Sequence, residues 1–405
     1  MFRFPARFTG SANRRFVITR ATSTALALLL ALVYTKVLGV DKRSVLAFVM
    51  TATLIVTIIF TSGISLTYRK NIHKGENERN LDAYLFLITF LSLMVAIVST
   101  GLLVIYSNIQ TTIPLNLYLI SFFYSFSACL NFGFQDALLA NARLKTATTL
   151  DLATILFQIL ICALMFALNI TSLIVSVFVA FISSYIFVTI TTLINLKESI
   201  HFEFSSLLPR TIRMIKESSH NYLYGIANGL ADRVDRLIIG LILPIGYLAK
   251  YSLMSSLLMY TRFLPDALSK LSLMSEEARN KLSSQVKGRR AILGITLIAC
   301  ALSALVQFFI FLVFGSIWLL PSIVPFLFAL QEVFRGYYQI GTAKLISQGK
   351  EQLVAKSSLA LIGLSILFIS VATYGLGIAG APLSMIFVYA LLNYQVQTFA
   401  KGQPG

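Results

Sequence analysis

The chain has 405 residues, of which 57% are hydrophobic and only 12% are charged. A soluble domain carries about 25% charged residues, roughly twice that share. The mean hydropathy of +0.82 and the long uninterrupted apolar runs exclude a water-soluble protein. Disordered chains and disulfide scaffolds are excluded by the same composition. A protein that crosses a membrane many times remains.

The net charge is +17, from 33 basic and 16 acidic residues. In a soluble chain this excess would suggest nucleic acid, but here it predicts basic loops beside a membrane and no nucleic-acid partner. The three cysteines, Cys129, Cys162 and Cys300, each stand alone in an apolar run, and the three histidines lie far apart. No metal site and no cofactor is therefore expected.

A helix needs about 20 apolar residues to cross a bilayer. The sequence predicts an all-α membrane protein with twelve transmembrane helices in two six-helix bundles. The expected spans are 18–40, 45–67, 83–107, 114–140, 149–169, 172–195, 219–243, 246–268, 291–314, 317–343, 354–374 and 378–399. The basic, amphipathic loop 196–218 separates them, so we expect an N-terminal bundle at 1–204 and a C-terminal bundle at 205–405.

The basic residues predict the orientation of these spans. With the N-terminus inside, 25 of the 33 basic residues lie in cytoplasmic segments, and only Lys36, Lys42 and Arg43 lie in external segments. The other five lie within predicted spans. Positively charged loops stay in the cytoplasm, so both termini are expected there. A weak internal sequence repeat supports duplication of the two halves, because residues 44–47 resemble residues 246–249 at a separation of 202 positions.

Charged residues interrupt the seventh span, where they are costly at about 2.5–3.5 kcal/mol each on insertion scales. If the span is one continuous helix, its polar residues share a face. That face holds Asn221, Gly225, Asn228, Asp232, Asp235 and Arg236, with Arg233 on its flank. Asp232 and Arg236 have the i,i+4 spacing of an ion pair within a helix.

Two further spans carry charge. In the tenth span, Glu332 and Arg335 have the i,i+3 spacing of an ion pair. In the eighth span, Arg262 and Asp266 are four residues apart, and Lys250 lies near the external end.

These charges have two interpretations. They could be structural ion pairs that hold helices together, or they could line a hydrated, partly cationic cavity. Arginine suits a phosphate-bearing ligand because its planar guanidinium can donate two hydrogen bonds at once. The carboxylates Asp232, Asp235 and Glu332 could carry a coupling ion.

Enzymes and ATP-driven pumps find little support. The predicted external loops are too short for a catalytic domain, and no GxxxxGK[ST] loop is present. Gly375, Gly377 and Gly380 spell GxGxxG, but they link two predicted membrane helices, so we expect a tight turn rather than a dinucleotide site.

The stretch from Asp232 to Gly240, followed by Ile245-Gly246-Tyr247, resembles the seventh and eighth helices of Wzx-type polysaccharide flippases of the MOP superfamily. The family pattern is roughly R-x-D-x-L-I-I-G and then L-G-x-Y. Arg233, Asp235 and residues 237–240 fit the first part, and the second part is one residue short. Thr61-Ser62-Gly63 is also similar to the family.

The resemblance implies a function, site and location. Such proteins move undecaprenyl-pyrophosphate-linked oligosaccharides from the inner to the outer leaflet of the bacterial cytoplasmic membrane, for O-antigen, lipopolysaccharide or capsule synthesis. It implies alternating access around a cationic cavity, membrane lipids as surroundings, and polymerase and chain-length regulator as possible partners. The substrate site would draw on Arg233, Arg236, Asp232, Asp235, Arg335, Glu332, Asn228, Lys250 and Arg262. The alternative is a multidrug or metabolite exporter of the MATE type.

Overall fold

The computed structural model describes residues 11–73, 80–141, 143–168, 172–197, 204–231, 233–258, 289–347 and 351–401. Within these residues, the regular secondary structure is helical throughout. This agrees with the prediction of an all-α protein, because a helix satisfies all its backbone hydrogen bonds internally and can therefore cross lipid.

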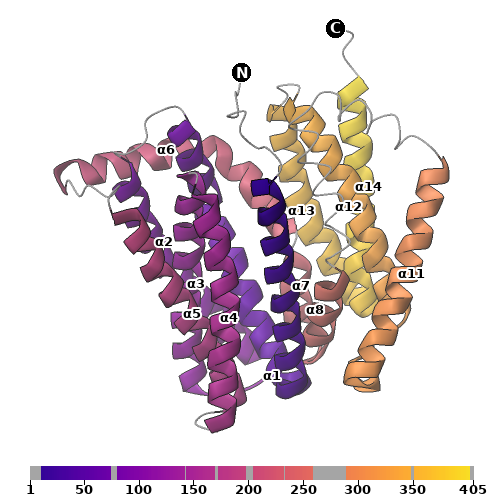
Figure 1. Ribbon diagram of the computed structural model, residues 1–405. Helices are drawn as coiled ribbons and strands as arrows, with labels where there is room; N and C mark the ends of the chain where they lie inside the picture. The colour runs from indigo at the N-terminus through magenta and orange to yellow at the C-terminus, as the bar shows by residue number, and fades with distance from the viewer. Residues whose placement is uncertain are drawn as a thin grey trace. The chain divides into compact units, whose positions relative to one another are not determined.

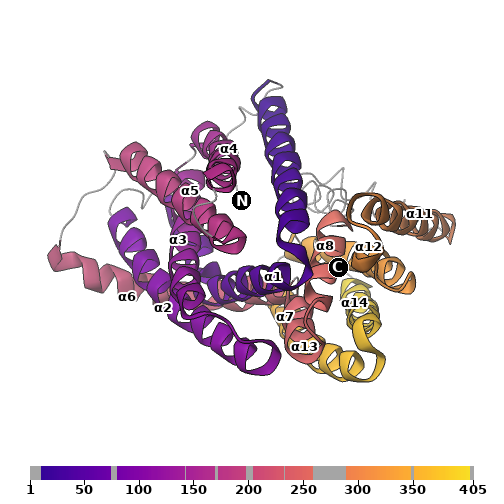
Figure 2. The ribbon, with the colours of Figure 1, turned by 90° about the horizontal axis from the view of Figure 1, so that it is seen from below.

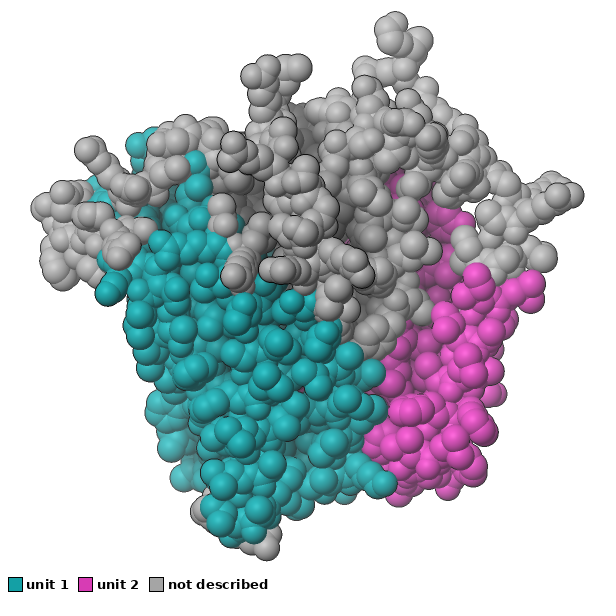
Figure 3. Space-filling view, in the orientation of Figure 1, with its two compact units in different colours: residues 1–42, 52–222 teal, residues 43–51, 223–405 magenta. Residues whose placement is uncertain are grey.

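The chain forms two compact units, coloured separately in Figure 3. Unit 1 comprises Met1–Lys42 and Ala52–Tyr222, and unit 2 comprises Arg43–Thr51 and Leu223–Gly405. A short segment of the N-terminal half therefore belongs to unit 2. The division into bundles at residues 204 and 205 stays a prediction, since these units describe contacts only.

The first two predicted spans are the two legs of a single long element, α1 (Ser11–His73). The legs meet at Gly39, whose backbone is non-helical with φ 71° and ψ −179°. Positive φ is readily available to glycine alone, so this residue allows the chain to change direction without a loop. Figure 2 shows the two legs running in different directions.

Four long apolar helices follow in unit 1 (Figure 1). They are α2 (Leu81–Gln110), α3 (Leu115–Ala140), α4 (Leu144–Leu168) and α5 (Leu173–Leu196). The helix α3 packs against α2, α4 and α5, and α4 also packs against α5. Large apolar side chains such as Phe90, Leu160 and Ile194 remain exposed on these helices. A lipid-facing surface accounts for that exposure.

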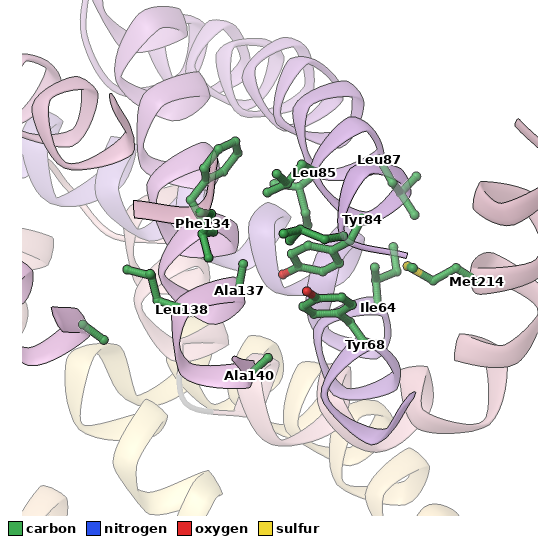
Figure 4. Close-up of a cluster of buried hydrophobic side chains, with 14 of the residues drawn as sticks. Ile64, Tyr68, Tyr84, Leu85, Leu87, Phe134, Ala137, Leu138, Ala140 and Met214 are labelled. Atoms are coloured by element: carbon green, nitrogen blue, oxygen red, sulfur yellow. The ribbon is translucent and has the colours of Figure 1, made fainter. Parts of the chain in front are cut away.

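The core of unit 1 is drawn in Figure 4 and includes two stacked tyrosines. The rings of Tyr68 and Tyr84 lie 4.2 Å apart, nearly parallel. The Tyr84 hydroxyl donates to the Gly133 carbonyl oxygen at 3.1 Å and also contacts the Ser65 hydroxyl at 3.1 Å. The Asn141 amide donates to the Tyr68 hydroxyl at 3.1 Å. These buried polar groups are paired within the unit.

The segment predicted as loop 196–218 is largely helical, which corrects that prediction. The helix α6 (Phe204–Ala231) begins in it and continues into the predicted seventh span. Figures 1 and 2 show α6 lying across the α2–α5 bundle rather than along it. The backbone of α6 touches α1 at Gly63, where a Cβ atom would lie 2.8 Å from the Tyr222 Cα. Only glycine permits so close an approach.

In the described part of unit 2, two short helices, α7 and α8, accompany four long ones. Its elements are α7 (Val234–Ile242), α8 (Tyr247–Leu258), α11 (Arg289–Phe314), η3 (Ser316–Trp318), α12 (Ile323–Ser347), α13 (Glu351–Leu376), η4 (Gly377–Ala379) and α14 (Gly380–Lys401). The helix α14 packs against α12 and α13, while α7 packs against α13 and α8 packs against α12. The short α7 and α8 are thus surrounded by longer helices of the same unit.

The predicted tight turn at the GxGxxG sequence is confirmed. Gly377 has φ 61°, and the single turn η4 joins α13 to α14. A Cβ atom on Gly380 would collide with the Ala372 carbonyl group, so glycine is required there by packing. This sequence therefore serves helix packing.

Six stretches of the described residues are long and apolar enough to cross a membrane. Two of them, Ala25–Ser65 with 41 residues and Lys356–Thr398 with 43, are each long enough for two crossings of about 20 residues. The predicted spans between 83 and 195 correspond to α2–α5, and those between 354 and 399 correspond to α13 and α14. The cytoplasmic placement of both termini remains a prediction.

Candidate functional site

Four buried charged residues of unit 2 lie on α7 and α12, beside a buried tyrosine of α8. We call this group the unit 2 charge cluster, and its members are Asp235, Arg236, Tyr251, Glu332 and Arg335. All five side chains are buried. Tyr251 is close enough to Asp235, Arg236 and Glu332 for each of them to act on it electrostatically. Asp235 and Arg236 of the predicted seventh span and Glu332 of the predicted tenth span therefore all lie near Tyr251.

The cluster begins where the helix is interrupted, which corrects the prediction of one continuous helix over 219–243. The helix α6 ends at Ala231, Arg233 has φ −137° and ψ −16°, and α7 begins at Val234. The helix expected to carry one continuous polar face from 221 to 236 is therefore interrupted. A break of this kind places backbone groups and side chains at membrane depth, which lipid tolerates only inside protein or beside a water-filled cavity.

Asp235 is held in the first turn of α7. Its Oδ1 accepts a hydrogen bond from the Arg236 backbone N–H at 2.7 Å, and its Oδ2 accepts one from the Tyr251 hydroxyl at 2.8 Å. The positive end of the helix dipole also favours a carboxylate at this position. Tyr251 is fully buried, and its ring packs edge-to-face on Phe328 at 5.7 Å. Tyr251 thus fixes the orientation of the Asp235 carboxylate.

The helix α12 contributes an ion pair to the cluster. The Arg335 guanidinium donates to the Glu332 carboxylate at 3.3 Å, as the i,i+3 spacing predicted. The neighbouring Gln331 is buried, and its side-chain oxygen has no hydrogen-bond partner among the described residues. A buried amide oxygen without a partner costs about 1–3 kcal/mol. It is therefore a point where a water molecule or a ligand hydroxyl would be stabilised.

The remaining predicted site residues divide into two groups. Arg233 is half-buried at the start of α7, and Lys250 lies on α8 with its ammonium 5.9 Å from the centre of the Tyr247 ring. Asp232, Arg262 and the side chain of Asn228 lie outside the described residues. The proposed pairs Asp232–Arg236 and Arg262–Asp266 therefore stay predictions.

Sequence reasoning missed one buried charge in this unit. The charge distribution predicts Arg43 in an external segment, but it lies in α1 within unit 2 and is only 5% exposed. Its neighbour Ser44 accepts a hydrogen bond from the Gly246 backbone N–H at 3.0 Å. Positions 44 and 246 are equivalent in the internal sequence repeat, so the two similar segments contact each other through this hydrogen bond.

The electrostatic balance of the cluster itself is even, with two arginines and two carboxylates. Half-buried Arg233, directly before α7, adds a further guanidinium group at the start of that helix. A guanidinium group that is already ordered by a carboxylate can bind a phosphate in its place. The planar carboxylate and the tetrahedral phosphate are both anions that accept two hydrogen bonds from one guanidinium. The described residues hold no group of three potential metal-ligating side chains.

Unit 1 contains a buried ion pair that the sequence did not reveal. The Arg210 guanidinium donates two hydrogen bonds to Asp82, at 2.9 Å to Oδ1 and 2.8 Å to Oδ2. Asp82 is 1% exposed and Arg210 is 17% exposed. The pair joins α6 to the first turn of α2. Because the partners are 128 residues apart, no local spacing could have predicted it.

A comparison with protein families gives one match. Residues 14–264 fit the profile of the family described as polysaccharide biosynthesis protein. The match covers more than half of the chain and includes α7 and α8. No curated protein matches the sequence.

Several solved structures share the fold. A lipid II flippase MurJ in an inward closed conformation aligns with a TM-score of 0.74 at 12% identity, covering 96% of this chain and 87% of that one. An inward-facing MATE multidrug resistance transporter of the MOP superfamily aligns at 0.64 with 11% identity, covering 95% and 96%. A MOP-superfamily transporter from Pyrococcus furiosus, described as having a binding pocket of reverse polarity, aligns at 0.52 with 13% identity, covering 95% and 94%. The expected MOP fold is thereby confirmed.

Proposed function

We propose, on the premise that this chain belongs to the polysaccharide biosynthesis protein family, that it is a flippase for lipid-linked oligosaccharides. Its substrate would be an undecaprenyl-pyrophosphate-linked unit, moved from the inner to the outer leaflet of the bacterial cytoplasmic membrane. The unit would then enter O-antigen, lipopolysaccharide or capsule. The family match and the fold shared with a lipid II flippase support a lipid-linked substrate.

The observation that carries the proposal is the unit 2 charge cluster. Arg233 and Arg236 supply guanidinium groups beside a break in the helix, where a pyrophosphate can accept forked hydrogen bonds. Asp235, held by Tyr251, and Glu332, paired with Arg335, keep the site near neutrality while it is empty. An empty site with uncompensated charge would be far more costly in a membrane.

Transport would proceed by alternating access, with the lipid tail remaining in the bilayer. Moving one negative charge outward across an inside-negative potential yields about 2.3 kcal/mol per 100 mV. A pyrophosphate carries more than one such charge, so the membrane potential alone can favour export. Asp235, Glu332 and Asp232 are the carboxylates that would exchange a proton or sodium ion if the transport is also ion-coupled.

The second candidate is a MATE-type exporter of drugs or metabolites. It is favoured by one observation, the fold shared with MATE transporters. Such a protein would bind cations, and its site would need more carboxylates than arginines. The cluster holds as many arginines as carboxylates, so its described residues do not supply that excess.

Partners follow from the proposed substrate. A polymerase and a chain-length regulator act on the exported unit and would be found near it in the membrane. A nucleic-acid partner, a cofactor and an enzymatic activity do not enter the proposal.

Complementation tests the proposal. A host that lacks the gene is given the wild-type chain, the double variant R233A/R236A, or the control K42A, which removes an exposed basic residue. We expect surface polymer to return with the wild type and the control and to be absent with the double variant at equal protein level. Normal polymer from the double variant would overturn the role of the arginines.

A further inference from the structure

The first half of α6 has three distinct sides. One side is buried against the rest of unit 1 and consists of Leu207, Thr211, Met214 and Ser218. Their spacing of four, three and four residues keeps them on one face of a helix. Met214 belongs to the core shown in Figure 4, and the Arg210–Asp82 pair fixes the helix at the edge of this side.

The second side is apolar and exposed. Leu208, Ile212 and Ile215 recur at four and three residues and are 62%, 45% and 48% exposed. At about 100° per residue they are centred roughly a quarter-turn from the buried side. Three large aliphatic side chains in a row would be unfavourable in water, so this side requires an apolar neighbour.

The third side is polar. Arg213, Lys216 and Glu217 are exposed there, and Arg213 pairs with Glu217 at 2.8 Å. Because Asp82 balances Arg210 and Glu217 balances Arg213, Lys216 supplies the basic excess of this stretch. The basic excess complements an anionic surface.

The direction of α6 identifies the neighbour. Figures 1 and 2 show α6 lying across α2–α5, and those helices are long and apolar enough to cross the bilayer. A helix across them is parallel to the membrane plane. Helices with an apolar side, a basic polar side and this orientation lie at the boundary of headgroups and acyl chains.

We propose that residues 204–218 form an interfacial helix, whose Leu208, Ile212 and Ile215 insert into the bilayer surface while Arg213 and Lys216 contact anionic phospholipid headgroups. The occupant of the exposed apolar side is therefore lipid. The rival occupants, a second copy of this chain or another protein, are outcomes of the test.

The test uses the full chain reconstituted into vesicles, with its three cysteines replaced by alanine. A fluorescent label is attached at I215C or at the matched control R213C. These positions are two residues apart but about 160° apart around the helix. Both side chains are exposed, so neither substitution disturbs the packing with unit 1.

We expect lipids with nitroxide-labelled acyl chains to quench the label at 215 several-fold more than the label at 213, and aqueous iodide to do the reverse. Equal quenching by iodide and none by lipid would overturn the proposal. Protection of 215 from both quenchers would also overturn it and would indicate a protein neighbour instead. A change of that protection with protein density in the vesicle would identify a second copy.

The headgroup contact is tested with the label kept at 215. Vesicles of phosphatidylcholine alone are compared with equal parts of phosphatidylcholine and phosphatidylglycerol. We expect the anionic lipid to deepen the label and K216Q to reduce that effect several-fold. An identical response of wild type and K216Q would overturn the basic contact.

Discussion

In unit 1 the buried Asp82 carboxylate meets Arg210 through two hydrogen bonds, whereas in unit 2 the buried Asp235 carboxylate meets the Tyr251 hydroxyl within a cluster that spans three helices. The first arrangement is a bidentate pair that holds α6 on α2. The second brings five polar or charged side chains together, and the neighbouring buried amide oxygen of Gln331 has no partner within the part of the chain that the structure describes. A forked pair fixes a helix, while a cluster with spare hydrogen-bonding capacity can receive a ligand.

The largest expected effect removes the arginines beside the helix break. Charge-assisted hydrogen bonds contribute about 1.5–3 kcal/mol each, so R233A/R236A should lower transport at least ~100-fold. Transport is measured as lipid-linked oligosaccharide reaching the outer leaflet, normalised to protein in the membrane. A loss of protein rather than of transport would place the arginines with the structural pair of unit 1.

Breaking the unit 1 pair should act on stability instead. Removing one partner of a buried ion pair costs about 3–5 kcal/mol, so D82A should lower the melting temperature of the purified protein. Transport per folded molecule should change little. The double variant D82A/R210A should recover part of the lost stability, because no charge is then left unpaired. Equal instability of the single and double variants would contradict the pairing.

The sequence predicted the apolar helices and the Glu332–Arg335 pair, because both follow from local spacing. It did not predict the break at Arg233, since no proline or glycine adjoins it to mark a helix end. The burial of Arg43 was missed because the residue lies at the edge of an apolar run. The Asp82–Arg210 and Tyr251–Asp235 contacts depend on tertiary packing, which a single sequence does not encode in any fixed spacing.

A smaller effect compares one hydroxyl in each unit. The Y251F substitution removes a hydrogen bond to a buried carboxylate, at a cost of about 1–3 kcal/mol, and should reduce transport about tenfold. The matched control Y84F removes the hydroxyl that donates to the Gly133 carbonyl oxygen in unit 1. It should reduce stability and leave transport per folded molecule unchanged. Identical behaviour of the two variants would erase the distinction between the units.

The smallest effect concerns ion coupling. E332Q keeps the shape of the side chain and its contact with Arg335 but can no longer lose a proton. If Glu332 exchanges protons, stimulation of transport by a pH gradient should disappear while stimulation by a membrane potential remains. Vesicles energised separately by each gradient measure this. An unchanged response to the pH gradient would exclude Glu332 as the coupling group.

The central claim is that this chain moves a lipid-linked oligosaccharide between leaflets. In the most direct measurement, its gene is deleted in the host. The outer leaflet of the cytoplasmic membrane is then exposed to a membrane-impermeant sugar-modifying enzyme. The account predicts that lipid-linked units accumulate on the inner leaflet, protected from the enzyme, and that surface polymer is lost. Units modified as in the parent strain, with surface polymer intact, would contradict it.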